Sequence, residues 1–466
     1  MPGNLYKLKK IFPKKVFKAL QPAYHFLQNF LAAVFYHFPS RKLIVIGVTG
    51  TTAKTSTTYL LVRTLRAAGY KVGYTSTAML SDGNSDWLNN KKMTMLGRFL
   101  TQKILRQMVR NGCEYAVVES TSEGARQFRH RFISYDVMIF TGLYPEHIES
   151  HGSFEKYKEA KGELFYHLKR GRLKYVNADK KVVKAKTALQ KLDLERVKRT
   201  IIANLDNDYA SYILSFWAEK KIGYSQDENK AAEFDKVEFM HYGEIEASVL
   251  GTSFFIGEEK FKLQLLGSFY AANAMNVIAC CQNQNISLEK IKIGLESVTN
   301  IPGRFERIPN SCNLRVIVDY AFEPKAVAGL YETISLLNPE KIIHILGSTG
   351  GGRDTARRPV LGRLAGQKAD YVIVTNEDPY DDNPAEIIDQ VAAGALEKGK
   401  ILDKDLFKIA DRREAIKKGL SLLGENDILL ITGKGSEQAI CVASGQMIPW
   451  DDREVAKEEL QALGCG

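Results

Sequence analysis

The residues with the clearest chemical potential lie between an apolar run and a segment with helical spacing. Residues 47–58 read GVTGTTAKTSTT, after KLIVIGV and before YLLVRTLRAAG. In a strand–loop–helix of this kind, free backbone N–H groups at the helix N-terminus bind phosphate. Lys54 would reach the terminal phosphates of a nucleotide, and the hydroxyl of Thr55 or Ser56 would reach a bound Mg²⁺. The segment therefore predicts a nucleotide phosphate loop.

Ala53 stands before that lysine, where such loops usually carry glycine. Its methyl group is tolerated if the backbone there avoids positive φ. Gly50, Thr51 and Thr52 would complete the loop. The alternative is a plain strand–turn–helix, but a lysine followed by two hydroxyls favours phosphate binding.

Two further clusters carry groups that suit a metal. Glu119 in VVESTSEG ends a predicted strand, and His147, His151 and Lys161 fall within YPEHIESHGSFEKYKEAKGELF. Carboxylates suit Mg²⁺, and an imidazole can join them. A lone Glu or His is more often structural. Here both clusters follow strands, and the carboxyl ends of parallel strands meet where ligands bind. We therefore expect Glu119 and His147 near the phosphate loop.

The elements that position these residues alternate between strand and helix, which predicts an α/β fold with a largely parallel sheet. Buried strands are predicted at 43–48, 115–120, 136–143 and 173–179, and helices between them, such as 98–111. Residues 221–266 are predicted as antiparallel strands at a flank, and 268–283 as a helix. A second α/β series follows Pro302 and Gly303, which we interpret as a hinge.

We divide the chain accordingly into three parts. These are a basic amphipathic helical segment at 1–40, a central ATP-binding domain at 41–302, and a C-terminal Rossmann-like α/β domain at 303–466. A chain of 466 residues with 45% apolar and 26% charged residues can bury the cores of two or three domains.

The N-terminal segment combines lysines with apolar residues. Its apolar run is too short to span a bilayer and is interrupted by Gln28 and Asn29. It is either a helix on a membrane surface or a helix pair packed on the next domain with a solvated lysine face. Much of the net charge of +11 lies here, so the charge does not indicate a nucleic-acid partner. The six scattered cysteines, without a CxxC, predict reduced thiols and a cytoplasmic protein without a zinc site.

Seven motifs together resemble the Mur ligase family, from about Lys42 to Leu460. In order they are GTTAKTS, VVESTSEG, EHIESHGSFEKYKEAK, LLGSFYAANAMN, IPGRFER, VDYAFEP and GKGSE. The combination of GGRDTARRP and VTNEDP is similar to the tripeptide-forming branch. The resemblance implies a monomeric ATP- and Mg²⁺-dependent ligase that joins an amino acid to a UDP-muramyl peptide through an acyl phosphate. That reaction serves peptidoglycan synthesis, and hence cell-wall biogenesis, cell shape and cell division.

The resemblance also implies residue roles. Asn273, Arg304 and Asp319 would join the phosphate loop in binding ATP. Glu119 and His147 would hold a second Mg²⁺, and Lys161 would be carbamylated and orient that cation. Three residues would bind the acceptor: Ser122, Gln127 and Arg129. The sequence departs from the family at Tyr270, where an asparagine is usual, and at Phe322 and Ser436, where histidine is usual.

The amino-acid pocket departs from the branch as well. Enzymes that add diaminopimelate carry DNPR, whereas residues 377–380 here read EDPY, so Tyr380 replaces the arginine. Arg353 is left to bind the α-carboxylate, near Gly433. Three acids would favour a cationic side chain such as that of L-lysine or another diamino acid: Glu377, Asp378 and Glu437. The alternative is that Glu377 and Asp378 cap the following helix.

The family's separate uridine-binding domain is not matched by residues 1–40, so the grip on the acceptor is expected to differ from the family's. Two other functions stay open at this point. One is a ligase for another carboxylate, in the style of folylpolyglutamate or cyanophycin synthesis. The other is a nucleotide-binding protein that has lost its catalytic activity. Its supporting evidence would be the departures at Ala53, Tyr270 and Phe322.

Overall fold

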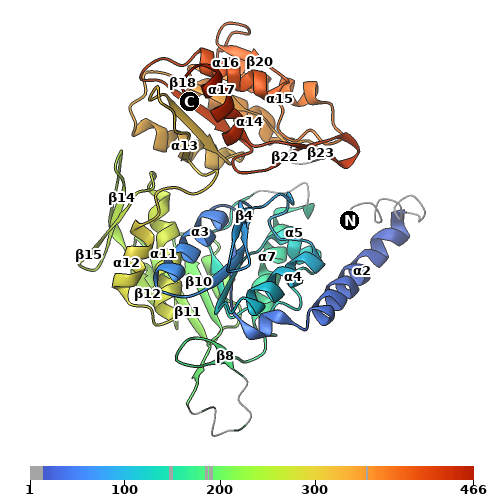
Figure 1. Ribbon diagram of the computed structural model, residues 1–466, viewed down its shortest axis with the longest axis vertical. Helices are drawn as coiled ribbons and strands as arrows, with labels where there is room; N and C mark the ends of the chain where they lie inside the picture. Colours follow the sequence, from blue (N-terminus) through green and yellow to red (C-terminus); the bar gives the residue numbers. More distant parts are fainter. Residues whose placement is uncertain (1–13, 146–150, 184–186, 188–190, 192, 353–354) are drawn as a thin grey trace.

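The computed structural model describes residues 14–145, 151–183, 187, 191, 193–352 and 355–466, with only the backbone described at 14–19. Two α/β domains are stacked along its long axis (Figure 1). The first domain comprises the elements α2 to α12, and the second comprises β16 to α17. The predicted α/β class is confirmed.

The first domain is built on a nine-stranded sheet of order β12-β11-β10-β6-β1-β5-β2-β3-β4. Neighbours from β12 to β2 pair in parallel, while β3 and β4 add antiparallel strands at one edge. The central strands are buried along their whole length, as expected for a parallel sheet covered on both faces. Their bounds are β1 Ile44–Thr49, β2 Val72–Thr75, β3 Met79–Ser81, β4 Asp86–Leu88, β5 Tyr115–Glu119, β6 Val137–Phe140, β10 Thr200–Asn204, β11 Lys220–Ser225 and β12 Glu238–His241.

Helices cover both faces of this sheet. The packed core on one face includes α3, α11 and α12, and the core on the other includes α4, α7 and α9. In α12, Gly294 lies so close to Thr64 of α3 that an added Cβ would stand 2.6 Å from the Thr64 Cα. The helix bounds are η1 Pro39–Lys42, α3 Lys54–Ala67, α4 Arg98–Arg110, α5 Ser122–Arg126, α7 Phe154–Leu168, α9 Ala210–Leu214, α10 Lys230–Glu233, α11 Phe269–Asn283 and α12 Leu288–Glu296.

The flank of the first domain corrects two strand predictions. Residues 221–225 and 238–241 were predicted as antiparallel, but they form β11 and β12 of the parallel sheet. The helices α9 and α10 make the crossovers that return these strands in parallel. The strand predicted at 173–179 is β7 Tyr175–Val176, which pairs with β8 Val182–Val183 and β9 Glu195–Arg196 outside the main sheet. The antiparallel prediction is confirmed for β13 Gly243–Ser248, β14 Gly251–Ile256 and β15 Glu259–Leu263.

The second domain has a six-stranded sheet of order β16-β17-β21-β18-β19-β20, in which only β16 is antiparallel. One core packs α13, α14 and α15 on it, and a second core packs α16 and α17. The bounds are β16 Glu306–Arg307, β17 Arg315–Asp319, α13 Pro324–Ser335, β18 Ile342–Leu346, α14 Arg357–Lys368, β19 Tyr371–Val374, α15 Pro384–Leu396, β20 Leu406–Lys408, α16 Arg412–Ser421, β21 Ile428–Thr432, β22 Ala439–Val442, η2 Ala443–Gly445, β23 Gln446–Pro449 and α17 Asp452–Ala462.

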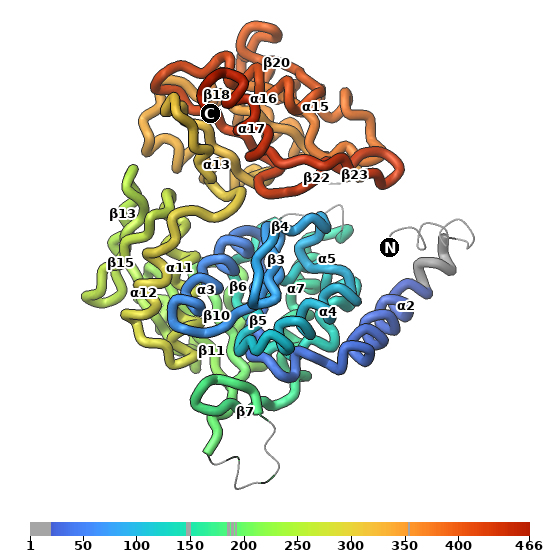
Figure 2. Tube along the Cα trace, viewed as in Figure 1, coloured from blue at the N-terminus to red at the C-terminus, as the bar shows by residue number. Residues whose placement is uncertain are grey.

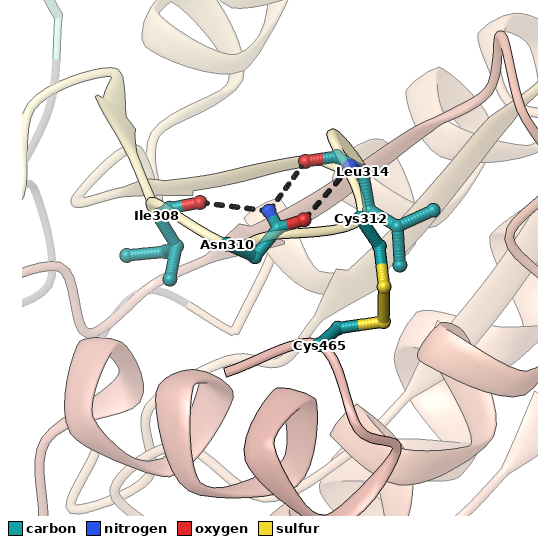
Figure 3. Close-up of a disulfide and its surroundings, with 5 residues drawn as sticks. All are labelled: Ile308, Asn310, Cys312, Leu314 and Cys465. Carbon is teal, nitrogen blue, oxygen red and sulfur yellow. Dashed lines mark hydrogen bonds between the residues drawn. A yellow bond between two sulfur atoms is a disulfide. The ribbon is translucent and has the colours of Figure 1, made fainter.

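A disulfide joins Cys312 to Cys465, so the expectation that all six cysteines are reduced is wrong for these two (Figure 3). The bond ties the residues after α17 to the turn between β16 and β17. Asn310 braces that turn by donating to the carbonyls of Ile308 and Leu314. The sequence could not indicate the pair, because 153 positions separate the two cysteines. The other four cysteines are free and buried.

The N-terminal helix α2 (Lys14–Phe35) lies on the outside of the first domain beside α4 (Figures 1 and 2). It buries His25, Asn29, Ala32 and Ala33. The helix pair, one of the two expectations, also involves residues 1–13, which lie outside the described part of the chain. None of the described helices combines the length and the apolar character needed to cross a bilayer.

Candidate active site

The phosphate loop connects β1 to α3, as predicted, but Ala53 adopts a φ of 65°. The condition stated for tolerating alanine, a backbone that avoids positive φ, is therefore not met. A left-handed alanine costs about 1–2 kcal/mol, and the surrounding contacts hold it in place. Thr57 N donates to the Ala53 carbonyl at 2.9 Å, and Thr51 N donates to the carbonyl of Gly142 at 2.8 Å. Gly50 leaves no room for a side chain, because an added Cβ would lie 2.0 Å from Oγ1 of Thr141.

Two lysine ammonium groups converge on this loop. Lys54 Nζ donates to the carbonyls of Gly50 at 3.1 Å and Thr51 at 2.7 Å. Lys161, buried on α7, donates from Nζ to the same Gly50 carbonyl at 2.7 Å. From the same helix, Tyr157 shares a hydrogen bond with the Thr51 hydroxyl at 3.0 Å. Two cations held beside one loop make its surroundings attractive to a polyanion.

Glu119 ends β5 and is completely buried next to the start of α3. Its carboxylate accepts hydrogen bonds from the Thr55 hydroxyl at 3.1 Å, from Thr77 N at 2.8 Å and from the Thr77 hydroxyl at 3.0 Å. All of these donors are neutral. Because a buried carboxylate is costly without a countercharge, this position suits a cation. Thr77 belongs to the site although no sequence motif pointed to it.

The second domain reaches the phosphate loop through Arg304. Its Nη2 donates to Oγ1 of Thr55 at 3.2 Å, while the guanidinium lies over the ring of Tyr320 at 4.3 Å. Asp319 at the end of β17 accepts from the backbone N–H groups of Phe305 and Ala321, each at 2.6 Å. Burial raises the pKa of Asp319, against the influence of Arg304. Asp319 thus holds the backbone that carries Arg304.

Helix α11 contributes Asn273 and Tyr270, both buried. Burial raises the pKa of Tyr270, and a hydrogen bond to Ser56 works against that rise, which places the tyrosine beside the phosphate loop. A second departure from the family, Phe322, lies under the guanidinium of Arg357 at 5.0 Å. An apolar ring therefore stands where a polar nucleotide contact would be expected.

The residues predicted to bind the acceptor come together around α5. Ser122 shares a hydrogen bond with Nε2 of His151 at 3.2 Å, and Arg129 donates from Nη2 to Oε1 of Gln127 at 2.6 Å. Burial, followed by the charge of Arg126, lowers the pKa of His151 to about 4. His151 is therefore neutral at physiological pH.

The acidic pocket predicted in the second domain is largely neutralised, which corrects our prediction of a free negative pocket. Lys434 donates to Asp378 at 2.8 Å and to Glu437 at 2.9 Å. Lys92 of the first domain also bonds both acids, reaching Asp378 at 2.7 Å. Burial lowers the pKa of Lys92, but Glu437 and Asp378 outweigh it and hold that pKa above its ordinary value. Neither lysine was singled out from the sequence.

Glu377 is the acid that keeps an unsatisfied oxygen. It is buried, and among the described residues its Oε2 has no hydrogen-bond partner. An added Cβ at Gly433 would stand 2.6 Å from that oxygen, so Gly433 leaves it room. Helix α15 is capped by Asn383, which accepts from Ala385 N at 3.1 Å. The alternative that Glu377 or Asp378 caps this helix is therefore wrong.

Of the remaining predicted residues, Tyr380 lies within the described part of the chain. Tyr380 has a φ of 52° and donates from its backbone N to the Cys441 carbonyl at 3.1 Å. His147 and Arg353 lie outside the described residues. Among the residues that the structure describes, no three His, Cys, Asp or Glu side chains form a metal-binding group.

Comparison with known proteins identifies the class. Residues 48–200 match the Mur ligase middle domain, and residues 303–435 match the Mur ligase glutamate ligase domain. The chain is 32% identical to a UDP-N-acetylmuramyl-tripeptide synthetase from Roseiflexus sp., covering 94% of this chain and 82% of the relative. The protein therefore belongs to the Mur ligase family, and it is an ATP-dependent ligase that forms amide bonds.

The chain is also similar to a second curated relative and to a solved structure. A UDP-N-acetylmuramoyl-L-alanyl-D-glutamate--2,6-diaminopimelate ligase from Clostridium tetani is 30% identical, covering 93% of this chain and 80% of the relative. A solved folylpolyglutamate synthase of Mycobacterium tuberculosis, with ADP bound, has a TM-score of 0.64 at 15% identity, covering 93% and 96% of the two chains. The latter likeness shows the fold alone.

Proposed function

We propose that this protein joins an amino acid to the free carboxylate of a UDP-N-acetylmuramyl dipeptide, using ATP, in peptidoglycan precursor synthesis. The observation that carries the proposal is the phosphate loop, where Lys54 and Arg304 gather from two domains. Two cations around one loop can neutralise the charge that develops during phosphoryl transfer.

The chemistry runs in two steps. An oxygen of the acceptor carboxylate attacks the γ-phosphorus of ATP, the bond to the bridging oxygen breaks, and ADP leaves. The amine nitrogen of the amino acid then attacks the acyl carbon, phosphate leaves with the bonding electrons, and the nitrogen loses a proton. Lys54 would hold the β- and γ-phosphates, and Arg304 would add charge as the domains close.

Magnesium fits the oxygen donors beside this loop. The Thr55 hydroxyl and the buried Glu119 carboxylate would hold it, and Mg²⁺ neutralises phosphate oxygens when it is bound. Carbamylation of Lys161 would give a second anionic group there. Ser122, Gln127 and Arg129 would bind the muramyl peptide, and Asn273 and Asp319 would support the nucleotide side.

A diamino acid such as L-lysine remains our choice of substrate, but the supporting residue changes. Asp378 and Glu437 are engaged by Lys92 and Lys434, so Glu377 is the acid left to receive a substrate ammonium. Tyr380 offers no guanidinium for the second carboxylate of diaminopimelate. Competition between L-lysine and meso-diaminopimelate in one reaction tests this choice. Glu377→Gln should lower the preference for L-lysine and the exposed Glu425→Gln should not, whereas a wild-type preference for diaminopimelate contradicts it.

The reaction itself is tested by phosphate release with a panel of carboxylate acceptors against the common amino acids. Release should require ATP, Mg²⁺, a muramyl peptide and an amino acid together. Lys54→Ala should lose about 3–4 kcal/mol of transition-state stabilisation, while Lys103→Ala, exposed on α4, should keep full activity. Activity with a folate or another carboxylate alone, or unchanged turnover in Lys54→Ala, would contradict the proposal.

We also propose that the protein works as a monomer in the cytoplasm, where ATP is supplied. Four buried free thiols agree with a reducing compartment, and the Cys312–Cys465 pair is the exception to be measured by thiol titration of protein from lysed cells.

A further inference from the structure

Helix α2 turns its large apolar side chains outward, whereas an ordinary surface helix turns them towards the core. Its buried face carries His25 and Asn29, and Asn29 donates to the carbonyls of His25 and Gln127. Its outward face is apolar. Seven large apolar side chains, each between 40% and 68% exposed, recur there at helical spacing: Leu20, Phe26, Leu27, Phe30, Leu31, Val34 and Phe35. Surface helices normally turn such a stripe towards the core.

The first domain covers only the edge of this stripe. Phe26 meets the ring of Phe132 edge-on and Phe30 meets it at a tilt, at 5.3 and 5.6 Å between centroids. Leu27 and Leu31 remain 54% and 47% exposed. A continuous apolar face of this kind marks a binding surface.

The chain around this apolar face is rich in basic residues, which bears on the kind of partner that the face binds. The first 18 residues contain six lysines, and the first acidic residue of the whole chain is Asp82. Helix α2 begins among these lysines, at Lys14, and Arg41 and Lys42 follow its other end. The acid whose charge acts on His25 of α2 is Glu123, and Glu123 pairs with Arg126.

We propose that α2 docks this ligase on an anionic membrane surface, with its apolar stripe in the interface and its lysines on the lipid headgroups. A helix with an apolar face flanked by cations binds in this way without spanning the bilayer. A second copy of the chain fits less well. Two aligned α2 helices would have no acid to pair with each other's cations, because lysines begin the helix, Arg41 and Lys42 lie in η1 beyond its end, and no acid stands between them.

The test is flotation of the full-length protein with vesicles of phosphatidylcholine alone or of phosphatidylcholine with phosphatidylglycerol. Binding is expected only with phosphatidylglycerol, and high salt should reduce it. Replacing Lys14, Lys15 and Lys18 together with Gln should lower vesicle affinity by about two orders of magnitude. The same change at the exposed Lys290, Lys398 and Lys404 should have little effect.

The apolar stripe is tested by Leu27→Gln with Leu31→Gln, which leaves the charge unchanged. This pair should lower vesicle affinity by about tenfold or more, whereas Leu250→Gln with Leu396→Gln, exposed elsewhere, should not. Phosphate release should stay normal in both pairs. Absence of wild-type binding to anionic vesicles at low salt would overturn the proposal. So would a dimer in sedimentation velocity that the Leu27/Leu31 pair abolishes while vesicle binding persists.

Discussion

Replacing Lys92 with Met tests whether one side chain holds the two domains together at the site. Lys92 belongs to the first domain, whereas its partners Asp378 and Glu437 belong to the second. The three side chains are 7%, 5% and 14% exposed, so water screens this contact little. Methionine keeps most of the length of the side chain and removes the charge.

The expected magnitude follows from the burial of this cluster. Removing one partner of a buried ion pair costs about 3–5 kcal/mol. Lys434 still bonds both acids in the variant, so we expect the lower end, about 3 kcal/mol, or more than a hundredfold in the closing equilibrium of the domains. The first domain should fold normally, because Lys92 bonds acids only in the second.

The assay combines small-angle X-ray scattering with steady-state kinetics. Lys92→Met should enlarge the radius of gyration and raise the KM for the amino acid, with ATP binding little changed. Lys91→Met removes the same charge from the exposed neighbour and should change neither quantity. An unaltered radius of gyration together with unaltered kinetics would refute the view that this ion cluster holds the domains closed.

Three other changes probe the phosphate loop, Lys161 and the core. Ala53→Gly should preserve activity and raise the free energy of unfolding by up to about 1 kcal/mol. Glycine relieves the left-handed alanine, and the greater entropy of the unfolded chain offsets part of that gain. A loss of stability in urea would contradict this. Lys161→Ala should be inactive and partly rescued by acetate, and the intact mass of active enzyme in bicarbonate should include a carbamate; an unmodified active lysine would rule it out. Burial lowers the pKa of His344 to about 3 in the folded protein. The unfolded chain takes up that proton near pH 6.5. The free energy of unfolding therefore falls as the pH drops below about 6.5, by about 2 kcal/mol at pH 5. Urea unfolding of His344→Gln should show a shallower loss between pH 7 and 5, and an unchanged slope would contradict it.

Local chemistry was readable from the sequence, and long-range pairing was not. The phosphate loop depends on residues adjacent in the chain, so spacing alone located Lys54 and Thr55 at the start of α3. Lys92 meets Asp378 and Glu437 across 286 and 345 positions, and nothing in its own neighbourhood signals that contact. The prediction of an acidic pocket counted the charges of Asp378 and Glu437 without the two lysines that fold onto them.

The direction of the strands and the orientation of helix α2 could not be predicted from the sequence either. The antiparallel prediction for Lys220–Ser225 considered strand residues but missed the short helix before them, which reverses the chain. Likewise, the amphipathic character of α2 was evident from its sequence, whereas the face turned outward was not. His25 and Asn29 find polar partners on the first domain, and this contact decides the orientation of the helix.

The Cys312–Cys465 bond changes how mechanical load passes through the molecule. It closes 153 positions of chain into a covalent ring that contains nearly all of the second domain. A pulling force applied at the two chain ends runs from the N-terminus to Cys312 and crosses directly to Cys465. The second domain therefore bears almost none of the tension, and pulling extends the enclosed chain only after the bond is reduced. Likewise, after a single protease cut within the ring, the disulfide still joins the two fragments.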